Sequence, residues 1–298
     1  MTIDEVLRES GQRLASAGVP NAAWDAELLL RHVLGWERAH LLAHMDDPLS
    51  PDAQRRYREL AAAREQRTPL QYLTRHQAFW RREFEVSPDV LIPRSETELL
   101  VEAALARVAD VTAPLVVDVG TGSGCIALSI ACDRSDAQVH ATDISSAALA
   151  VAQRNAERLG CAQRVFLHQG DLLAPVEQLA GAIDAVVSNP PYVARGDADA
   201  LAPEVRDHEP SLALFPDGAV DSLYRRLIPA AWQLLRSEGW LLLEVGLGMA
   251  EGVARLCVDA GFVADTPLTD LSGTARVVSA RKGRRYSASV RTAGAALS

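Results

Sequence analysis

Residues 115–131 read LVVDVGTGSGCIALSIA, and this stretch decides the fold. Its first five residues are apolar and mostly β-branched, with Asp118 as the exception, so they predict a buried parallel strand. Three glycines, at positions 120, 122 and 124, then allow a sharp turn in which the backbone approaches a ligand closely. Cys125 begins an apolar run that predicts a helix. A strand–turn–helix unit of this kind is typical of nucleotide-binding sheets, and nicotinamide enzymes share it.

Strands and helices alternate through the rest of the chain. We expect strands over residues 115–119, 138–143, 164–168, 183–188 and 239–245. We expect helices over residues 123–133, 146–160, 220–236 and 248–260. Segments 261–263 and 276–280 are typical of a closing pair of strands. This alternation predicts a Rossmann-like α/β fold, in which a mostly parallel sheet has helices on both faces.

A second acid, Asp143, ends the strand that follows the glycine turn. Ligands of open parallel sheets bind beyond the carboxyl ends of the strands, so Asp143 and Gly120 should border one crevice. A carboxylate there can accept hydrogen bonds from both ribose hydroxyls of a nucleoside. The alternative is an ordinary acid at a helix start, ahead of Ser145, and the spacing from the glycines favours the ribose role. Residues 170–172 should border the crevice near a flat base.

The strand over residues 183–188 stops at Asn189, because the two prolines that follow cannot donate to a sheet ladder. Residues 189–192 offer an amide side chain, a rigid backbone carbonyl and the flat ring of Tyr192. These groups can hold a planar NH2 group by its two hydrogens while a ring stacks on its π face. The alternative is a proline-rich loop with an incidental tyrosine, and the nearby nucleoside crevice counts against it.

The first 74 residues predict a small helical bundle. One helix should cover residues 22–34 with Asn21 as its cap, and another should begin at Ser50 with a proline in its first turn. Residues 79–90 are bulky and β-prone, so they predict a hairpin between the bundle and the sheet. The bundle is either a stabilising cap or a docking surface for a macromolecular substrate.

Residues 90–100 read VLIPRSETELL. A proline ends the extended segment, and Ser95 with Glu98 fits a capping box for the next helix. Arg94 and Glu96 are either solvent-exposed cap residues or part of one lip of the pocket.

The composition sets limits on the partners. A net charge of −9 argues against broad electrostatic binding to nucleic acid. The four cysteines show no metal-type clustering. No stretch approaches the roughly 20 apolar residues that a membrane span requires, and the acidic N-terminus lacks a signal-peptide core. We therefore expect a cytoplasmic protein without a membrane anchor or a metal. Residues 284–298 predict a disordered tail.

Together, these motifs resemble those of S-adenosylmethionine-dependent amino-methyltransferases. The likeness is greatest to the protein-(glutamine-N5) methyltransferases of the HemK type, which modify peptide-chain release factors. The segments that carry the resemblance are 69–72, 90–98, 118–124, 187–193 and 204–210. Residues 189–192 alone would also fit DNA adenine enzymes, whereas the motifs are highly specific as a set.

The resemblance implies a helical N-terminal domain over residues 1–74, a hairpin linker over 75–94 and a class I methyltransferase domain over 95–283, followed by the tail at 284–298. It implies methyl transfer from S-adenosylmethionine, without a metal, to the N5 amide nitrogen of the glutamine in a Gly-Gly-Gln sequence of class 1 release factors. We expect a monomer that binds no nucleic acid directly.

The resemblance also assigns site residues. Cofactor contacts fall on Gly120, Thr121, Gly122, Ser123, Gly124, Asp143, Leu172 and Asn189. Substrate contacts fall on Asn189, Pro190, Pro191 and Tyr192, of which Asn189, Pro190 and Tyr192 are expected to be catalytic. Three residues depart from the family's pattern: Arg75 stands where glycine is usual, Leu172 where an aromatic is common, and Met249 in a segment where a glutamine is expected.

An amide nitrogen is a poor nucleophile because resonance delocalises its lone pair. No strong base is apparent near Asn189, so we predict catalysis by positioning. The side-chain oxygen of Asn189 and the carbonyl of Pro190 would accept the two amide hydrogens, while Tyr192 packs against the amide plane. Well-oriented reactants can reach effective molarities of roughly 10⁵–10⁸ M.

Three other functions use parts of the same pattern. An N6-adenine methyltransferase acting on DNA or rRNA would also grip an NH2 group, but the acidic charge and the lack of a target-recognition insert count against it. A nicotinamide oxidoreductase leaves residues 189–192 unexplained. A non-catalytic cofactor-binding module would bind the cofactor without forming a methylated product.

Overall fold

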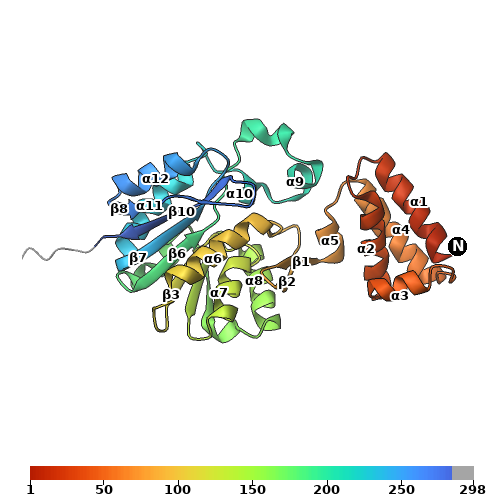
Figure 1. Cartoon of the computed structure of the whole chain (residues 1–298), viewed down its shortest axis with the longest axis horizontal. Helices are drawn as coiled ribbons and strands as arrows, with labels where there is room; N and C mark the ends of the chain where they lie inside the picture. The colour runs from red at the N-terminus through yellow and green to blue at the C-terminus, as the bar shows by residue number, and fades with distance from the viewer. Residues whose placement is uncertain (284–298) are drawn as a thin grey trace, which may run out of the picture.

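The structure is a computed structural model that describes residues 1–283. The predicted disordered tail, residues 284–298, lies outside the described residues. Figure 1 shows a cluster of N-terminal helices at one end of the molecule, the main sheet with its helices at the other, and a small hairpin between them. Within residues 1–283, no helix combines the length and the apolar character that crossing a membrane requires.

Within residues 1–283, the main sheet has eight strands, and its five parallel strands lie in the order β5-β4-β3-β6-β7. These are β3 (Leu115–Val119), β4 (Gln138–Asp143), β5 (Val165–Gln169), β6 (Ile183–Ser188) and β7 (Leu235–Glu244). The antiparallel edge contains β8 (Phe262–Ala264), β9 (Leu268–Thr269) and β10 (Ala275–Lys282), and β10 pairs with β7. The predicted α/β fold is confirmed, and β3, β4 and β6 have the predicted bounds.

Helices cover both faces of this sheet. One face carries α6 (Glu98–Arg107), α7 (Cys125–Asp133) and α8 (Ser146–Arg158). The other face carries α11 (Ser222–Leu234) and α12 (Ala250–Asp259). Short turns η2 (Ala162–Arg164) and η3 (Ala174–Leu179) flank β5. Every residue of β6 is buried, which explains why apolar residues occur on both faces of this strand rather than on one.

The N-terminal region is helical, as predicted. Its helices are α1 (Ile3–Ser16), α2 (Ala22–Leu34), α3 (Arg38–Ala43), α4 (Pro51–Glu65) and α5 (Leu70–Thr74). Ser50 caps α4, because its hydroxyl oxygen accepts a hydrogen bond from the backbone N–H of Ala53 at 3.3 Å. Asn21 occupies the predicted N-cap position of α2, but its side chain makes no capping bond. Thr2 and Glu5 instead form a capping box at α1.

The predicted hairpin is present but begins earlier than expected, with strands β1 (His76–Phe79) and β2 (Arg82–Glu85). Arg75 precedes β1 and has a φ angle of +65°. Glycine adopts this left-handed conformation at the least cost, which gives a physical reason for the glycine that is usual at this position. The turn therefore forms in this chain at the expense of some backbone strain at an arginine.

The predicted capping box at Ser95 and Glu98 is wrong. A 3-10 turn, η1 (Ser95–Thr97), precedes α6, and the Ser95 hydroxyl donates to the Glu96 carboxylate at 3.0 Å. Glu98 instead accepts a hydrogen bond from the backbone N–H of Trp80 at 2.8 Å. This bond ties the start of α6 to the hairpin.

The segment after β6 contains η4 (Arg195–Ala200), α9 (Pro203–His208) and α10 (Ser211–Leu214). Figure 1 shows α9 on the side of the sheet that faces the N-terminal helices. The Glu204 carboxylate accepts hydrogen bonds from Arg64 at 2.8 Å and from Arg67 at 2.7 Å. Arg64 is buried and also donates to Asp25 at 2.8 Å. These ion pairs join the helical region to the loop that follows β6.

Candidate active site

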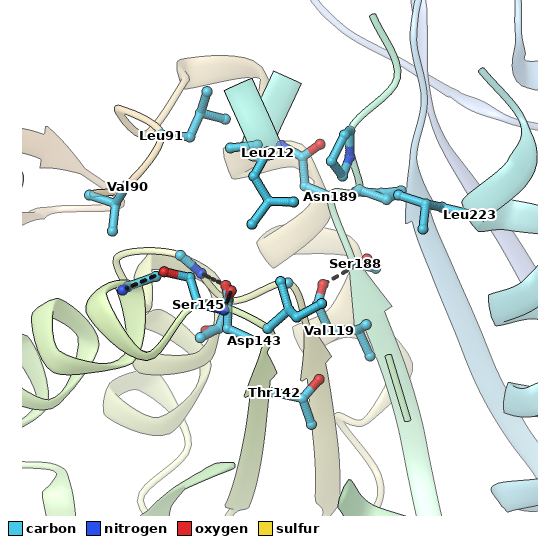
Figure 2. Close-up of a pocket in the computed structure, with 18 of the residues that line it drawn as sticks. Val90, Leu91, Val119, Thr142, Asp143, Ser145, Ser188, Asn189, Leu212 and Leu223 are labelled. Atoms are coloured by element: carbon cyan, nitrogen blue, oxygen red, sulfur yellow. Dashed lines mark hydrogen bonds between the residues drawn. The ribbon is translucent and has the colours of Figure 1, made fainter. Parts of the chain in front are cut away.

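A pocket with a cavity of about 260 Å³ opens at the carboxyl ends of β3, β4 and β6, where the strand order reverses. Figure 2 shows Asp143 and Asn189 on opposite sides of it, with Val119 on the side of Asp143. The predicted site residues that line the pocket are Gly120, Thr121, Gly122, Ser123, Asp143, Leu172, Asn189, Pro190 and Pro191. In the described part of the chain, Gly124 and Tyr192 adjoin these residues without lining the pocket.

The glycine turn is held against the neighbouring strand by its backbone. The N–H groups of Gly120 and Thr121 donate to the carbonyl of Thr142 at 2.9 and 3.0 Å. Gly120 and Gly122 have φ angles of +74° and +56°, which favour glycine. A Cβ added at either glycine would meet nothing within 4 Å, so open space lies beside the turn. This is the space that a bound ligand needs for a close approach to the backbone.

Asp118 braces the same turn from inside the sheet. One carboxylate oxygen accepts hydrogen bonds from the Thr121 hydroxyl at 2.6 Å and from the backbone N–H of Ala127 at 3.2 Å. Its other oxygen, Oδ1, has no hydrogen-bond partner within the described residues. Burial raises the pKa of Asp118 to about 7, although both hydrogen bonds oppose the change. The acid therefore has a structural role beneath the turn.

Asp143 faces the pocket from the end of β4. Its two carboxylate oxygens accept hydrogen bonds at 2.9 Å from the backbone N–H groups of Gly122 and Ser145. Burial raises the pKa of Asp143, and these backbone bonds lower it. A carboxylate has about four acceptor positions, so it retains capacity for hydroxyl groups of a ligand. Asp143 thus supports the start of α8, as the simpler interpretation held, and also lines the pocket.

The opposite wall begins at Asn189, directly after β6. The Asn189 side-chain nitrogen donates to the Thr97 hydroxyl oxygen at 3.2 Å. Pro190 and Pro191 follow along the rim, and the N–H of Val193 then donates to the carbonyl of Leu214 at 3.0 Å. This wall combines an amide side chain with a backbone carbonyl that precedes a proline.

Tyr192 lies behind the pocket, where its ring packs on the core between the sheet and α11–α12. Its hydroxyl donates to the Glu244 carboxylate at 3.4 Å. Burial raises the pKa of Tyr192 to about 12, so the phenol is neutral at physiological pH. The predicted stacking of this ring on a substrate amide is not visible in the pocket as it stands and stays a prediction.

Two buried polar residues behind Asn189 escaped the sequence analysis. Thr97 is 2% exposed and Glu244 is 1% exposed. Burial raises the pKa of Glu244 to about 7, whereas hydrogen bonds from the hydroxyls of Thr97 and Tyr192 lower it. The sequence did contain a signal for Glu244, which directly follows the apolar residues 240–243 at the end of β7. An ionisable side chain in a buried strand requires specific polar partners, so such a residue indicates a polar contact.

Arg94 lines the pocket, and Glu96, the other residue considered for the lip, does not. Arg94 donates to the Glu209 carboxylate at 2.6 Å. The other oxygen of Glu209 accepts from the backbone N–H of Ile92 at 3.4 Å. The Glu209 side chain is buried, so this ion pair fixes segment 90–94 against the loop after β6.

The pocket has the chemistry that an adenosyl cofactor requires. Open space lies beside the turn glycines, and Asp143 offers acceptors for ribose hydroxyls. Val119, Ile126, Ile144 and Leu172 supply apolar surface for a base. Leu172 has a φ angle of +49°, an unusual conformation for leucine. Residues 1–283 contain no group of three His, Cys, Asp or Glu side chains arranged to hold a metal ion.

The sheet order, the glycine turn at the reversal point and the sequence Asn-Pro-Pro-Tyr after β6 define a class I methyltransferase. Among solved structures, the catalytic domain of hMettl16 in complex with MAT2A 3'UTR hairpin 6 has this fold. It aligns with a TM-score of 0.56 at 13% identity, over 82% of this chain and 92% of that chain. At that identity the likeness concerns the fold alone.

Sequence comparisons identify the family within this class. Residues 5–74 match the family described as the PrmC N-terminal domain, and residues 95–212 match the methyltransferase small domain. Release factor glutamine methyltransferase of Cereibacter sphaeroides is 44% identical over 281 residues, which cover 94% of this chain and 99% of the relative. Its namesake from Geobacter sulfurreducens is 44% identical over 95% of this chain and 97% of the relative. The chain belongs to the release factor glutamine methyltransferase family, as its motifs predicted.

Proposed function

We propose that this protein transfers a methyl group from S-adenosylmethionine to the side-chain amide nitrogen, N5, of the glutamine in the Gly-Gly-Gln sequence of class 1 release factors. One observation carries the proposal beyond family membership. Asn189 and Pro190 line the wall of the pocket opposite Asp143, so an NH2 group held there would face a cofactor bound over the glycine turn.

The cofactor side of the pocket comprises residues of the turn and its neighbours. We assign cofactor contacts to Gly120, Thr121, Gly122, Ser123, Asp143, Leu172 and Asn189, with Gly124 shaping the turn. A Cβ at Gly124 would lie 2.9 Å from a methyl carbon of Leu128. It would also lie 3.2 Å from the Cβ of Ala152, so Gly124 allows the start of α7 to lie close to α8. S-adenosylmethionine, when bound, supplies an electrophilic methyl group on a positively charged sulfur.

The substrate side comprises residues 189–192. In the proposal, the oxygen of the Asn189 side chain and the carbonyl oxygen of Pro190 accept the two N–H hydrogens of the glutamine amide. Both acceptors draw electron density toward the amide nitrogen and stop the amide from rotating. Tyr192 supports this wall from behind, where its hydroxyl donates to Glu244.

In this proposal, the rate of methyl transfer comes from the alignment of the substrate amide with the methyl group. An amide nitrogen is weakly nucleophilic because its lone pair is delocalised into the carbonyl. Aligned reactants can gain roughly 7–11 kcal/mol of the barrier from orientation alone. No side chain needs to remove a proton before methyl transfer, since the N-methylated amide becomes acidic once it carries a positive charge and can lose its proton to water.

The alternative acceptor is the N6 amino group of adenine in DNA or rRNA, which also presents two hydrogens. The names of the relatives and the net charge of −9 favour glutamine. We further expect a cytoplasmic protein, because its proposed substrate is a translation factor, and we expect it to be a monomer. Sedimentation of the purified protein would test the monomer.

Mass spectrometry provides the test. A class 1 release factor is incubated with the protein and S-adenosylmethionine, and the peptide that contains Gly-Gly-Gln is analysed. We expect a gain of one methyl group on the glutamine side chain. A release factor with glutamate at that position is the matched control and should gain none. Labelled methyl transfer to duplex DNA or rRNA, with none to the release factor, would overturn the proposal.

A further inference from the structure

Four polar side chains from distant parts of the sequence lie together at and behind the pocket wall. The Asn189 side-chain nitrogen donates to the Thr97 hydroxyl oxygen at 3.2 Å. Thr97 also lowers the pKa of Glu244, because its side chain lies next to that carboxylate. The Tyr192 hydroxyl donates to the same carboxylate at 3.4 Å. Two ends of the sequence Asn-Pro-Pro-Tyr are therefore linked through one buried acid.

The chemistry of these side chains determines which group donates and which accepts in each contact. A threonine hydroxyl has one hydrogen, and here its oxygen already accepts from Asn189, so the hydrogen is available to Glu244. Glu244 Oε2 is buried, and no group in residues 1–283 meets hydrogen-bond geometry with it. A carboxylate only accepts hydrogen bonds, and a buried one that lacks a donor is costly. The hydrogen of the Thr97 hydroxyl is therefore the neighbouring donor that this carboxylate can attract.

This assignment of donors and acceptors determines whether the oxygen or the nitrogen of the Asn189 amide faces the ligand. With the nitrogen turned toward Thr97, the oxygen on the other arm of the planar amide is presented on the pocket side. Figure 2 shows Asn189 at the pocket wall beside Leu212. If the amide turned over, its NH2 group would meet the NH2 group of a substrate amide, and two donors cannot bond.

We propose that Thr97 and Glu244 are positioning residues that fix the Asn189 side chain with its oxygen, rather than its nitrogen, toward the substrate. The inference rests on the proposed function, because it assigns the Asn189 oxygen to a substrate NH2 group. Neither residue needs to touch the reacting atoms. Their effect is to remove the wrong rotamer of Asn189, which would otherwise compete for the same site.

Protonation of Glu244 should weaken the arrangement. The neutral acid can donate to Thr97, which allows the Thr97 hydroxyl to turn and donate toward Asn189, and that favours the inverted amide. The titratable and charged groups around Glu244 are Glu96, Cys125, Tyr192, Tyr224 and Arg276. Burial raises the pKa of Cys125 and Tyr192 to about 12, so these groups stay neutral at physiological pH.

The first test compares substitutions at Thr97 on a Gly-Gly-Gln peptide. Thr97→Val removes the hydroxyl at nearly constant volume, and we expect kcat to fall about ten- to thirtyfold, with cofactor affinity unchanged. Thr97→Ser keeps the hydroxyl and should restore most of the rate. Thr112→Val, at an exposed position before β3, is the matched control and should behave as wild type. Equal loss in Thr97→Val and Thr97→Ser would indicate a packing role and overturn the inference.

The second test uses the pH profile. Glu244→Gln keeps an acceptor for Thr97 and a donor for the Tyr192 oxygen but cannot titrate. We expect kcat of the wild type to decrease as pH falls through the pKa of Glu244, and the Glu244→Gln profile to lack this limb while retaining most of the rate at pH 8. Glu244→Leu removes the acceptor and should lower kcat at every pH. An unchanged acid limb in Glu244→Gln would contradict the inference.

A third measurement separates this inference from the proposed function. In protein labelled with ¹⁵N-asparagine, the side-chain NH2 signals of Asn189 are assigned by their absence in Asn189→Asp. We expect slow exchange with solvent in wild type and Thr97→Ser, and faster exchange in Thr97→Val. This readout needs no turnover, so it decides the orientation of Asn189 even if the peptide is not methylated. Identical exchange in all three proteins would overturn the positioning role.

Discussion

The two walls of the pocket are built in different ways. The cofactor wall is held by hydrogen bonds between residues 3, 9 and 21 positions apart, which run from Thr121 and Ala127 to Asp118 and from Gly122 to Asp143. The substrate wall is held by bonds between residues 52, 92 and 115 positions apart. One wall is a local product of a strand, a turn and a helix. The other exists only when distant segments have folded together.

Because of this difference, we expect the two walls to control different steps. The local wall should govern how tightly the cofactor binds, because its groups are backbone N–H donors and one carboxylate. The assembled wall should govern turnover, because it orients an acceptor group. Substitutions on the two walls should therefore separate cofactor affinity from kcat.

The largest expected effect is on the substrate wall. Asn189→Ala removes an acceptor for the substrate amide and should lower kcat about a hundred- to a thousandfold, as loss of one preorganised polar group typically does. The free energy of unfolding should change by less than about 1 kcal/mol, because Asn189 is only partly buried. The assay is single-turnover methylation of a Gly-Gly-Gln peptide.

The matched control for that substitution is Gln153→Ala. Gln153 carries the same amide group on the exposed side of α8, where it bonds to Glu157. It should retain wild-type turnover. Near-native turnover in Asn189→Ala would remove the basis for assigning the substrate wall to residues 189–192.

A substitution in the cofactor wall should change cofactor affinity rather than kcat. Asp143→Ala removes the acceptor for ribose hydroxyls and should weaken S-adenosylhomocysteine binding about ten- to a hundredfold in calorimetry, the range expected for charge-assisted hydrogen bonds. At saturating cofactor, kcat should remain within about fivefold of wild type. Asp259→Ala, at an exposed position ending α12, is the control. If Asp143→Ala lowered kcat without changing affinity, the two walls would not differ as described.

A third prediction concerns the stability of the cofactor wall. Burial raises the pKa of Asp118 from an ordinary value of 3.8 to about 7 in the folded protein. The folded state therefore holds this proton more tightly than the unfolded state, so the contribution of Asp118 to stability is full below its unfolded pKa. That contribution declines as pH rises toward 7. Urea unfolding of wild type and Asp118→Asn should show a stability difference that shrinks over this range. A difference independent of pH would contradict the shifted pKa.

The smallest expected effect lies at the outer edge of the substrate wall. Glu204→Gln weakens the ion pairs with Arg64 and Arg67 that join the N-terminal helices to the loop after β6. We expect hydrogen exchange to become faster in segments 60–70 and 200–210, and kcat to fall about two- to fivefold. Cofactor affinity should stay unchanged. A loss of cofactor affinity instead would show that the loop supports both walls.

The same contrast explains what the sequence could predict. The bounds of β3, β4 and β6 and the place of Gly120 and Asp143 at one crevice followed from apolar patterning and glycine spacing, because local hydrogen bonds decide them. Thr97 and Glu244 did not follow, since their partners are set by the packing of distant elements. The Ser95 capping box failed for a related reason: Glu98 bonds to the hairpin, and this tertiary contact overrides the local motif.

The orientation of Asn189 is central to this account, and a crystal structure with S-adenosylhomocysteine and a Gly-Gly-Gln peptide measures it most directly. The decisive quantity is the distance from the glutamine amide nitrogen to the Asn189 side-chain oxygen and to the Pro190 carbonyl oxygen. We predict both distances at about 3 Å, with the Asn189 nitrogen on Thr97. An amide nitrogen lying beyond hydrogen-bond reach of both oxygens, or an Asn189 side chain turned the other way, would contradict the account.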